Sequence, residues 1–424
     1  MALSILQSFV SIFILLFDTN ELIRVVMHVR ATDGVYVAWF GCHKVTDEES
    51  IEFAFSGVSF AIRVAGAQCV YVDMRGGHGR FRVRKRNLRT GISCDETICA
   101  GNKMDRIQIA SELDSSYDYE ILVVKLSEVE VRSIFSSFYP ALVRGIYIDQ
   151  GRFVPIDTKK TFYPRGWIEA IGDSDACGFG VSGPPTSTWN FLSMDPTAQS
   201  VLSAWGCKVA EMMGLGELAV RTIAGSGTGI TRNAIFCGGK TLPLLWREAN
   251  LYSISSRPTE APQAVIVLGG GNDFFNFGRP DEAEFVLRFK QFLGDLHKQH
   301  GSTVPIYVFQ CCASCSSSGG SPLIHPMDDP EVLLTSSLLI EFTRRAVSEA
   351  VIEFGRMFRF EVLDVKLNLL SDFGTMMHWN GSGQHKIALN MLNFIIPQNT
   401  KTSSSGGARF VPLKLKRMNG IEYS

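Results

Sequence analysis

The chain has 424 residues, of which 46% are apolar, so it can bury a large core, and its length suggests two or three domains. Its 41 basic and 42 acidic side chains nearly cancel, which leaves no net charge to attract nucleic acid or an anionic membrane surface. The composition therefore excludes a disordered chain. It also excludes a protein that binds an anionic partner through an overall positive charge of its own.

Residues 1–33 are predicted to be a leader or an N-terminal extension. The apolar stretch 3–17 is short for a membrane span but has the length of the apolar region of a signal peptide. No Lys or Arg precedes it, and no small-x-small cleavage site follows. A buried helix or a wrongly assigned start of the protein is the alternative. We expect a secreted protein without a stable membrane span.

Residues 34–160 are predicted to form a β-sandwich. Apolar residues alternate there in short runs separated by Gly, Ser and Asp, and many short strands at this spacing are typical of a sandwich. The clearest runs are residues 50–56, 58–64, 69–73 and 119–125. The basic run 80–86 alternates with Phe81 and Val83, so we interpret it as the solvent face of a strand.

Residues 161–398 show a different pattern, in which strand, glycine turn and helix repeat. The predicted strands are 167–171, 218–223, 264–268, 305–310 and 358–365, and the predicted helices include 200–213, 281–300 and 334–354. This alternation predicts an α/β fold with a parallel sheet covered by helices on both faces. Residues 399–424 are predicted to be a loose tail, since they contain the Ser/Gly stretch 403–407.

The ten cysteines are scattered, apart from the pair Cys94 and Cys99 and the group Cys311, Cys312 and Cys315. That group resembles half of a zinc site, but no second pair follows at zinc-finger spacing. We therefore expect no metal, and structural thiols or disulfides are favoured.

Three glycine turns follow predicted strands: Gly-Asp-Ser at 172–174, Ser-Gly-Thr-Gly at 226–229 and Gly-Asn-Asp at 271–273. Ligands of an open α/β sheet bind at such strand ends. Nucleotide binding is disfavoured, because Ile230 stands where the dinucleotide pattern needs Gly and the third turn lacks the Lys-Ser/Thr of a phosphate loop. A hydrolase would use all three turns together with His378.

In this order, the three turns and the segment His-Trp-Asn-Gly-Ser-Gly-Gln-His at 378–385 are similar to the four blocks of the SGNH (GDSL-like) hydrolases. Residues 34–398 more closely resemble carbohydrate esterase family two, whose members place a jelly-roll β-sandwich before a three-layer SGNH domain. The segments that carry this closer resemblance are 51–57, 123–128, 145–151, 226–233 and 271–274. The resemblance implies deacetylation of plant-type polysaccharides such as xylan or glucomannan.

The resemblance also implies roles for individual residues. Ser174 would be the nucleophile, and His378 would be the base that accepts its proton. The backbone N–H groups of Ser174 and Gly227 and the side-chain amide of Asn272 would form the oxyanion hole. Such an enzyme needs no metal and no organic cofactor, and its partner would be an acetylated polysaccharide or oligosaccharide.

The chain departs from the SGNH pattern around the histidine. Most members carry an Asp two or three residues upstream, but here Met376 and Thr375 occupy those positions, and the nearest acid is Asp372. Some family members lack this acid, so we predict a Ser-His dyad oriented by a backbone carbonyl, with Asp372 as the minor candidate for a third member. Gln384 replaces a frequent second histidine, and His385 is predicted to be structural.

The sequence leaves several alternatives open. Trp379 could bind substrate by stacking on a sugar ring, although burial in the core is favoured. Asp173 and Asp273 are predicted to cap or brace their turns. An SGNH lipase or lysophospholipase is a competing function that the sandwich disfavours. A non-catalytic glycan-binding protein is another competing function. The presence of all four candidate catalytic residues disfavours it, whereas Met376, at a position where most members have Asp, favours it.

Overall fold

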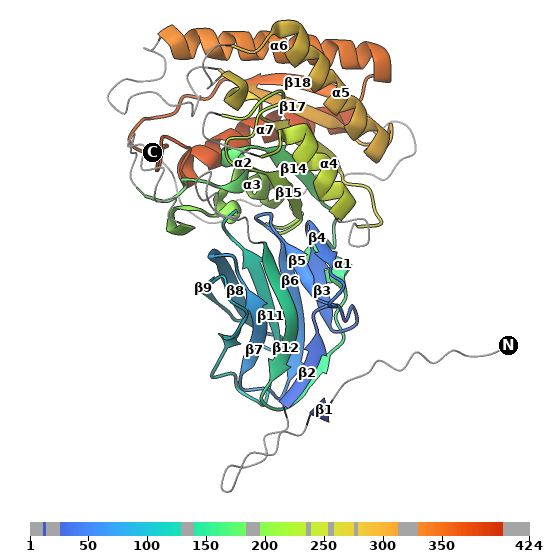
Figure 1. Ribbon diagram of the computed structural model, residues 1–424, viewed down its shortest axis with the longest axis vertical. Helices are drawn as coiled ribbons and strands as arrows, with labels where there is room; N and C mark the ends of the chain where they lie inside the picture. The colour runs from blue at the N-terminus through green and yellow to red at the C-terminus, as the bar shows by residue number, and fades with distance from the viewer. Residues whose placement is uncertain are drawn as a thin grey trace, which may run out of the picture.

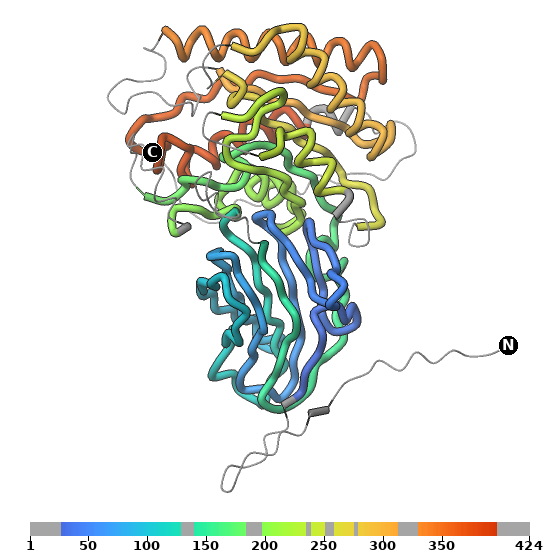
Figure 2. Tube along the Cα trace, viewed as in Figure 1, coloured from blue at the N-terminus to red at the C-terminus, as the bar shows by residue number. Residues whose placement is uncertain are grey.

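The computed structural model describes residues 12–13, 26–128, 140–183, 196–234, 239–252, 258–274, 279–312 and 330–401. Strands of the N-terminal part form one end of the molecule, and helices around a further sheet form the other (Figure 1). The chain completes the antiparallel sheets before it enters the α/β part, as the colours of Figure 2 show. The predicted fold class, a β domain followed by an α/β domain, is confirmed.

Two antiparallel sheets make up the N-terminal part. In the first, the strand order is β1-β2-β12-β5-β4, and β7 pairs with both β12 and β10. Its strands are β1 (Ile12–Phe13), β2 (Val26–Arg30), β4 (His43–Val45), β5 (Ile51–Phe53), β7 (Val70–Arg75), β10 (Asp105–Ala110) and β12 (Ala141–Ile148). In the second, the order is β13-β6-β11-β8-β9, with β3 on β6. Its strands are β3 (Val37–Phe40), β6 (Ser59–Ala65), β8 (Gly79–Asn87), β9 (Ser93–Ala100), β11 (Asp118–Lys125) and β13 (Arg152–Val154).

The N-terminal sheets extend into the range predicted as a leader. Strands β1 and β2 lie before residue 34, pair with each other, and join the sheet through β12. Residues 1–11 and 14–25, with most of the signal-like stretch, lie outside the described residues. So does the predicted tail from residue 402 onward, while helix α7 reaches Lys401.

The basic run on β8 is not the solvent face that we predicted. Phe81 and Val83 point into the core, as expected from the alternation. On the opposite face, Arg80 donates to the carbonyl oxygen of Thr197 at 2.6 Å, and Arg82 binds the carboxylate of Glu217 at 2.7 Å. These arginines therefore join the sandwich to the α/β part, a contact that alternation alone cannot distinguish from exposure to water.

The C-terminal part contains a five-stranded parallel sheet in the order β15-β14-β16-β17-β18. Its strands are β14 (Ile168–Gly172), β15 (Val220–Ala224), β16 (Ala264–Leu268), β17 (Ile306–Cys311) and β18 (Phe358–Leu363). The helices of this part are α1 (Thr158–Phe162), α2 (Ser174–Cys177), α3 (Trp205–Met212), α4 (Leu242–Tyr252), α5 (Glu282–His300), α6 (Pro330–Phe354) and α7 (Gly381–Lys401), with short 3₁₀ turns η1 (Pro196–Ala198), η2 (Val201–Ser203) and η3 (Gly271–Phe274).

Helices cover both faces of the parallel sheet. Successive strand residues point to opposite faces, so Ile266 belongs to one core cluster with residues of α3 and α7, while Val267 belongs to another with residues of α4 and α5. Helices α5 and α6 lie side by side at the end of the molecule farthest from the sandwich (Figure 1). Strands β14, β15 and β16 are buried along their whole length, in agreement with the doubly covered sheet that the alternation of strand, glycine turn and helix predicted.

A charged pair is buried inside this sheet. Glu169 on β14 and Arg221 on β15 are register partners, and Oε2 of Glu169 lies 2.6 Å from Nη1 of Arg221. The indole N–H of Trp246 donates to the other carboxylate oxygen at 2.8 Å. Burial alone would raise the pKa of Glu169, but Arg221, His300 and Trp246 together hold it far below its ordinary value. The carboxylate is therefore ionised and fully paired in the folded protein.

Replacement of Glu169 by Gln should destabilise the fold by about 3 to 5 kcal/mol at neutral pH, because it leaves the buried guanidinium of Arg221 without its counter-charge. Urea unfolding followed by circular dichroism measures this change. Since the pKa of Glu169 is lowered on folding, its contribution is complete above the ordinary value of 4.5 and is lost as the pH falls further. The difference between parent and variant should therefore shrink in acid.

The matched control is Asp295→Asn, which removes a partly exposed partner of Arg247. It should change the free energy of unfolding by less than about 1 kcal/mol, because exposed ion pairs contribute little. An equal loss in both variants would contradict the role given to the buried pair.

Candidate active site

The three glycine turns meet at one edge of the parallel sheet. Strands β15, β14 and β16 are neighbours, so their carboxyl ends, where the turns begin, lie together. Gly172 ends β14, and a Cβ there would lie 2.5 Å from the carbonyl oxygen of Leu268 and 2.8 Å from Cβ of Ala176. Only glycine allows the strand and the following helix to pack this closely.

Ser174 is the first residue of the short helix α2. Asp173 caps this helix, its carboxylate accepting from the N–H of Asp175 at 3.4 Å. Nε2 of His378, which lies 204 residues further along the chain, is 2.8 Å from Oγ of Ser174. The structure therefore brings together the predicted nucleophile and base at hydrogen-bond distance.

The turn before His378 has an unusual backbone. Met376 and Met377 both adopt left-handed conformations, with φ of 55° and 58°, which side chains other than glycine rarely occupy. The turn closes through a hydrogen bond of 2.7 Å from the N–H of Gly374 to the carbonyl oxygen of His378. Such conformations cost about 1 to 3 kcal/mol each, so the surrounding contacts must enforce them.

Gly180, in the loop after α2, holds this turn in place. Its carbonyl oxygen accepts from the N–H of Thr375 at 3.0 Å, and a Cβ at Gly180 or at Gly374 would overlap the backbone of the other segment. Phe179 packs against the imidazole of His378 with its ring centroid 4.8 Å away. The loop that follows the nucleophile therefore also positions the base.

Asp372 does not contact the histidine. Its carboxylate accepts from the N–H of Asn368 and from Nζ of Lys386, both at 2.7 Å, and from the hydroxyl of Ser382 at 2.8 Å. Burial would raise its pKa, but these donors lower it. Nδ1 of His378 is buried without a hydrogen-bond partner among the described residues. Among the described residues, neither Asp372 nor a backbone carbonyl group therefore binds Nδ1 of the ring.

The predicted oxyanion donors lie on the two turns beside the nucleophile. Gly227 has φ of 74°, a conformation that favours glycine. Nδ2 of Asn272 donates to Oδ2 of Asp173 at 3.1 Å and to the carbonyl oxygen of Thr228 at 3.0 Å. The Asn272 amide thus links all three turns, and serving an oxyanion would require it to release one of these two acceptors.

Asp273 braces the second turn, as predicted. Its buried carboxylate accepts from the backbone N–H groups of Ile230, Thr231 and Arg232 at 2.6 to 3.1 Å. The neighbouring Asp173 is partly buried, and burial together with the charge of Asp175 raises its pKa. Asp273 therefore fixes the second turn, while Asp173 lies next to the candidate nucleophile.

Trp379 is not a sugar-stacking platform in this structure. Its side chain is only 2% exposed and lies in the core between the sheet and helices α3 and α7, so the alternative of burial is the correct one. Gln384 is also buried and links three elements: its amide donates to the carbonyl oxygen of Asp175, and its oxygen accepts from the N–H of Trp205. His385 is exposed on α7.

Sequence reasoning gave no role to Glu128 or Cys177, which lie directly beneath the site. The buried Glu128 carboxylate accepts from the N–H of Ser226 at 2.9 Å and from the thiol of Cys177 at 3.4 Å. Glu128 follows the last residues of the sandwich strand β11, 98 residues before Ser226. An acid at the end of a strand was visible in the sequence, but its distant partner was not.

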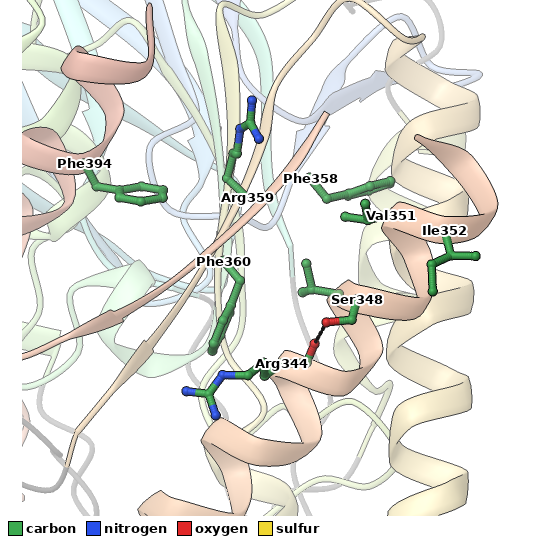
Figure 3. Close-up of a pocket in the computed structure, with 9 residues that line it drawn as sticks. Arg344, Ser348, Val351, Ile352, Phe358, Arg359, Phe360 and Phe394 are labelled. Atoms are coloured by element: carbon green, nitrogen blue, oxygen red, sulfur yellow. Dashed lines mark hydrogen bonds between the residues drawn. The ribbon is translucent and has the colours of Figure 1, made fainter. Parts of the chain in front are cut away.

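A groove of about 520 Å³ lies elsewhere, between α6, β18 and α7 (Figure 3). The guanidinium of Arg344 lies 5.6 Å from the ring centroid of Phe360, and the lining includes Arg359 and Phe394. None of its lining residues belongs to the turns that carry Ser174 and His378.

The part of the chain that the structure describes contains no cluster of three His, Cys, Asp or Glu side chains that could hold a metal ion. None of its helices is both long enough and apolar enough to cross a membrane. No disulfide joins two of the eight described cysteines; Cys237 and Cys315 lie outside the described residues.

A β-sandwich before a parallel sheet with Ser and His at its carboxyl edge defines a class of fold. This is the fold of the SGNH (GDSL-like) hydrolases, in the two-part arrangement of the family two carbohydrate esterases. Comparisons of the sequence with protein-family models and with curated proteins found no match. Beyond the short motifs described above, the likeness therefore rests on structure.

Three solved structures illustrate this likeness. A family two carbohydrate esterase from Cellvibrio japonicus is 15% identical, with a TM-score of 0.64 over 88% of this chain and 97% of that one. One from Clostridium thermocellum, in complex with cellohexaose, is 16% identical (TM-score 0.62, 85% and 98%). An acetyl xylan esterase from the rumen bacterium Butyrivibrio proteoclasticus is 14% identical (TM-score 0.63, 88% and 98%).

A fluorophosphonate probe should label Ser174, because a base at 2.8 Å from a serine hydroxyl activates it for attack on phosphorus. Mass spectrometry of the digested protein identifies the modified residue. Labelling should disappear in Ser174→Ala. It should persist in Ser182→Ala, the control, which replaces a serine of the neighbouring loop. Equal labelling of another serine would contradict the assignment.

Asp372→Asn should leave kcat/KM for an ester substrate within a few-fold of the parent, because this carboxylate binds Asn368, Ser382 and Lys386 rather than His378. When an aspartate orients a catalytic histidine, its replacement by Asn typically lowers kcat by a factor on the order of 10⁴. Steady-state kinetics well below the unfolding temperature of the variant distinguish the two. A loss of three or more decades would make Asp372 the third catalytic residue.

Proposed function

We propose that this protein is a serine esterase that removes acetyl groups from an acetylated polysaccharide of the xylan or glucomannan type. The observation that carries the proposal is the 2.8 Å contact between Oγ of Ser174 and Nε2 of His378, at the carboxyl edge of the sheet in an SGNH-like fold. This is the geometry that an activated serine nucleophile requires.

In the proposed reaction, Nε2 of His378 takes the proton of Ser174 while Oγ attacks the carbonyl carbon of the acetyl ester. The tetrahedral intermediate collapses when His378 returns the proton to the departing sugar oxygen. Water, deprotonated by the same imidazole, then releases acetate from the acetyl-enzyme and restores the serine hydroxyl. Protons pass among Ser174, His378, the sugar hydroxyl and water, and the acetic acid formed from water and the acetyl group ionises to acetate after release.

Charge on the acyl oxygen would be stabilised by the N–H groups of Ser174 and Gly227 and by the amide of Asn272. The buried turns that hold these groups support this role, because donors fixed before the reaction lose little energy in reorganising. The Asn272 amide would exchange one of its present acceptors, Asp173 or Thr228, for the oxyanion. The Ser174–His378 pair would act as a dyad, since the nearby Asp372 is bound elsewhere.

A glycan substrate is favoured by the structural neighbours, one of which is an acetyl xylan esterase and another a complex with cellohexaose. At 14 to 16% identity these neighbours support the proposal only through the shared fold. Action outside the cell belongs to the same proposal, because the polymer is found there and the stretch 3–17 has the length of the apolar region of a signal peptide.

Two other functions use the same fold. A GDSL-like lipase from Bacteroides ovatus is 12% identical, with a TM-score of 0.53, so acyl-chain cleavage is one alternative. A non-catalytic glycan-binding protein is the other. The intact contact between Ser174 and His378 favours catalysis over binding alone.

The preference for acyl-chain length distinguishes the three functions. Initial rates on 4-nitrophenyl acetate, butyrate, octanoate and palmitate should fall as the chain lengthens, and acetate should be released from acetylated xylan or glucomannan. Ser174→Ala is the matched control and should lose both activities. Preference for octanoate or palmitate would identify a lipase, whereas glycan binding without hydrolysis of any ester would identify a binding protein.

A further inference from the structure

The sandwich contributes one side chain to the region beneath the candidate active site. Glu128 stands three residues beyond the end of β11, and its carboxylate is buried in the α/β part. Its own backbone N–H donates to the side-chain oxygen of Gln199, which is also buried, at 3.2 Å. The residue is therefore fixed to the α/β part through both backbone and side chain.

The Glu128 carboxylate joins the two segments that carry the proposed catalytic groups. One oxygen accepts from the N–H of Ser226 at 2.9 Å, and the other accepts from the hydroxyl of the same serine. Ser226 directly precedes Gly227, a proposed oxyanion donor. The first oxygen also accepts from the thiol of Cys177 at 3.4 Å, and Cys177 lies one helical turn after Ser174.

This placement has an electrostatic cost, because a buried carboxylate beside other acids is unfavourable without compensation. Lys125, at the end of β11, is fully buried and attracts Glu128, although burial lowers its pKa to about 7. Its ammonium group donates to the carbonyl oxygen of Ser127. A neutral side chain would avoid this cost, but a carboxylate can accept from Ser226 N–H, Ser226 Oγ and Cys177 simultaneously.

We propose that Glu128 is a positioning residue that fixes the oxyanion-hole turn relative to the nucleophile, so that the sandwich completes the active site of the α/β part. The proposal rests on the proposed esterase function. The N–H groups of Ser174 and Gly227 must point at the same oxyanion, and displacement of a catalytic group by about 1 Å can cost 10²-fold in rate. Glu128 restrains both segments directly.

The test compares Glu128→Gln with the parent. The glutamine has the same shape, but its amide nitrogen is a donor, so at least one of the present donors loses its acceptor. We expect kcat for 4-nitrophenyl acetate to fall by about 10-fold or more while KM stays within about 3-fold, because the oxyanion exists mainly in the transition state. Hydrogen exchange of residues 225–229 should become faster.

Glu217→Gln is the matched control. Glu217 also joins the sandwich to the α/β part, through Arg82 and Arg84, but it touches neither candidate catalytic segment. It should leave kcat and the exchange of residues 225–229 unchanged. An equal fall of kcat in both variants would show general loosening of the interface, and an unchanged kcat in Glu128→Gln would equally overturn the proposal.

If Glu128→Gln does not fold, Ser226→Ala tests the same contact by removing only the hydroxyl. It should lower kcat in the same direction but by less, and an unchanged kcat would overturn the proposal. If the parent hydrolyses no ester, the proposed function fails. Hydrogen exchange then still decides whether Glu128 holds the turn: faster exchange in Glu128→Gln supports this, and unchanged exchange contradicts it.

Discussion

The hydrogen bond between Ser174 and His378 is the interaction on which the candidate site depends. It spans 204 residues, so it forms only when the first strand of the parallel sheet and the turn before α7 are both in place. The serine follows the junction of β14 with α2, where only glycine fits at position 172. The histidine comes from a turn with two left-handed methionines. The loop after α2 holds the histidine turn in place, because the carbonyl oxygen of Gly180 accepts a hydrogen bond from the N–H of Thr375.

Carboxylates organise the region around this pair without touching the imidazole. Asp273 binds three N–H groups of the second turn, and Asp372 holds the approach to the histidine turn. Glu128 reaches the second turn from the sandwich, while the buried Glu169–Arg221 pair lies within the sheet below. Each acid is paired or hydrogen-bonded, as burial requires. The acids therefore shape the site, while the dyad alone is proposed to perform proton transfer.

The two parts of the molecule are mechanically connected. Three arginines of the sandwich strand β8 bind groups of the α/β part: Arg80 binds the carbonyl oxygen of Thr197, and Arg82 and Arg84 bind the carboxylate of Glu217. Glu128 adds a contact that leads directly to the turn containing Gly227. The sandwich is therefore tied by direct hydrogen bonds to the turn that precedes Gly227.

The sequence alone determined that a strand-rich part precedes an α/β part, that the sheet of the α/β part is parallel, and where its glycine turns lie, because local periodicity and glycine reveal these features. The prediction of Ser174 and His378 came from the resemblance of their short segments to the blocks of the SGNH hydrolases. Only the tertiary structure decided the burial of Trp379, the distance of Asp372 from the imidazole, the interface role of the β8 arginines and the position of Glu128. These depend on contacts between residues far apart in the chain, and the alternation of side chains along a strand does not reveal what lies opposite each face.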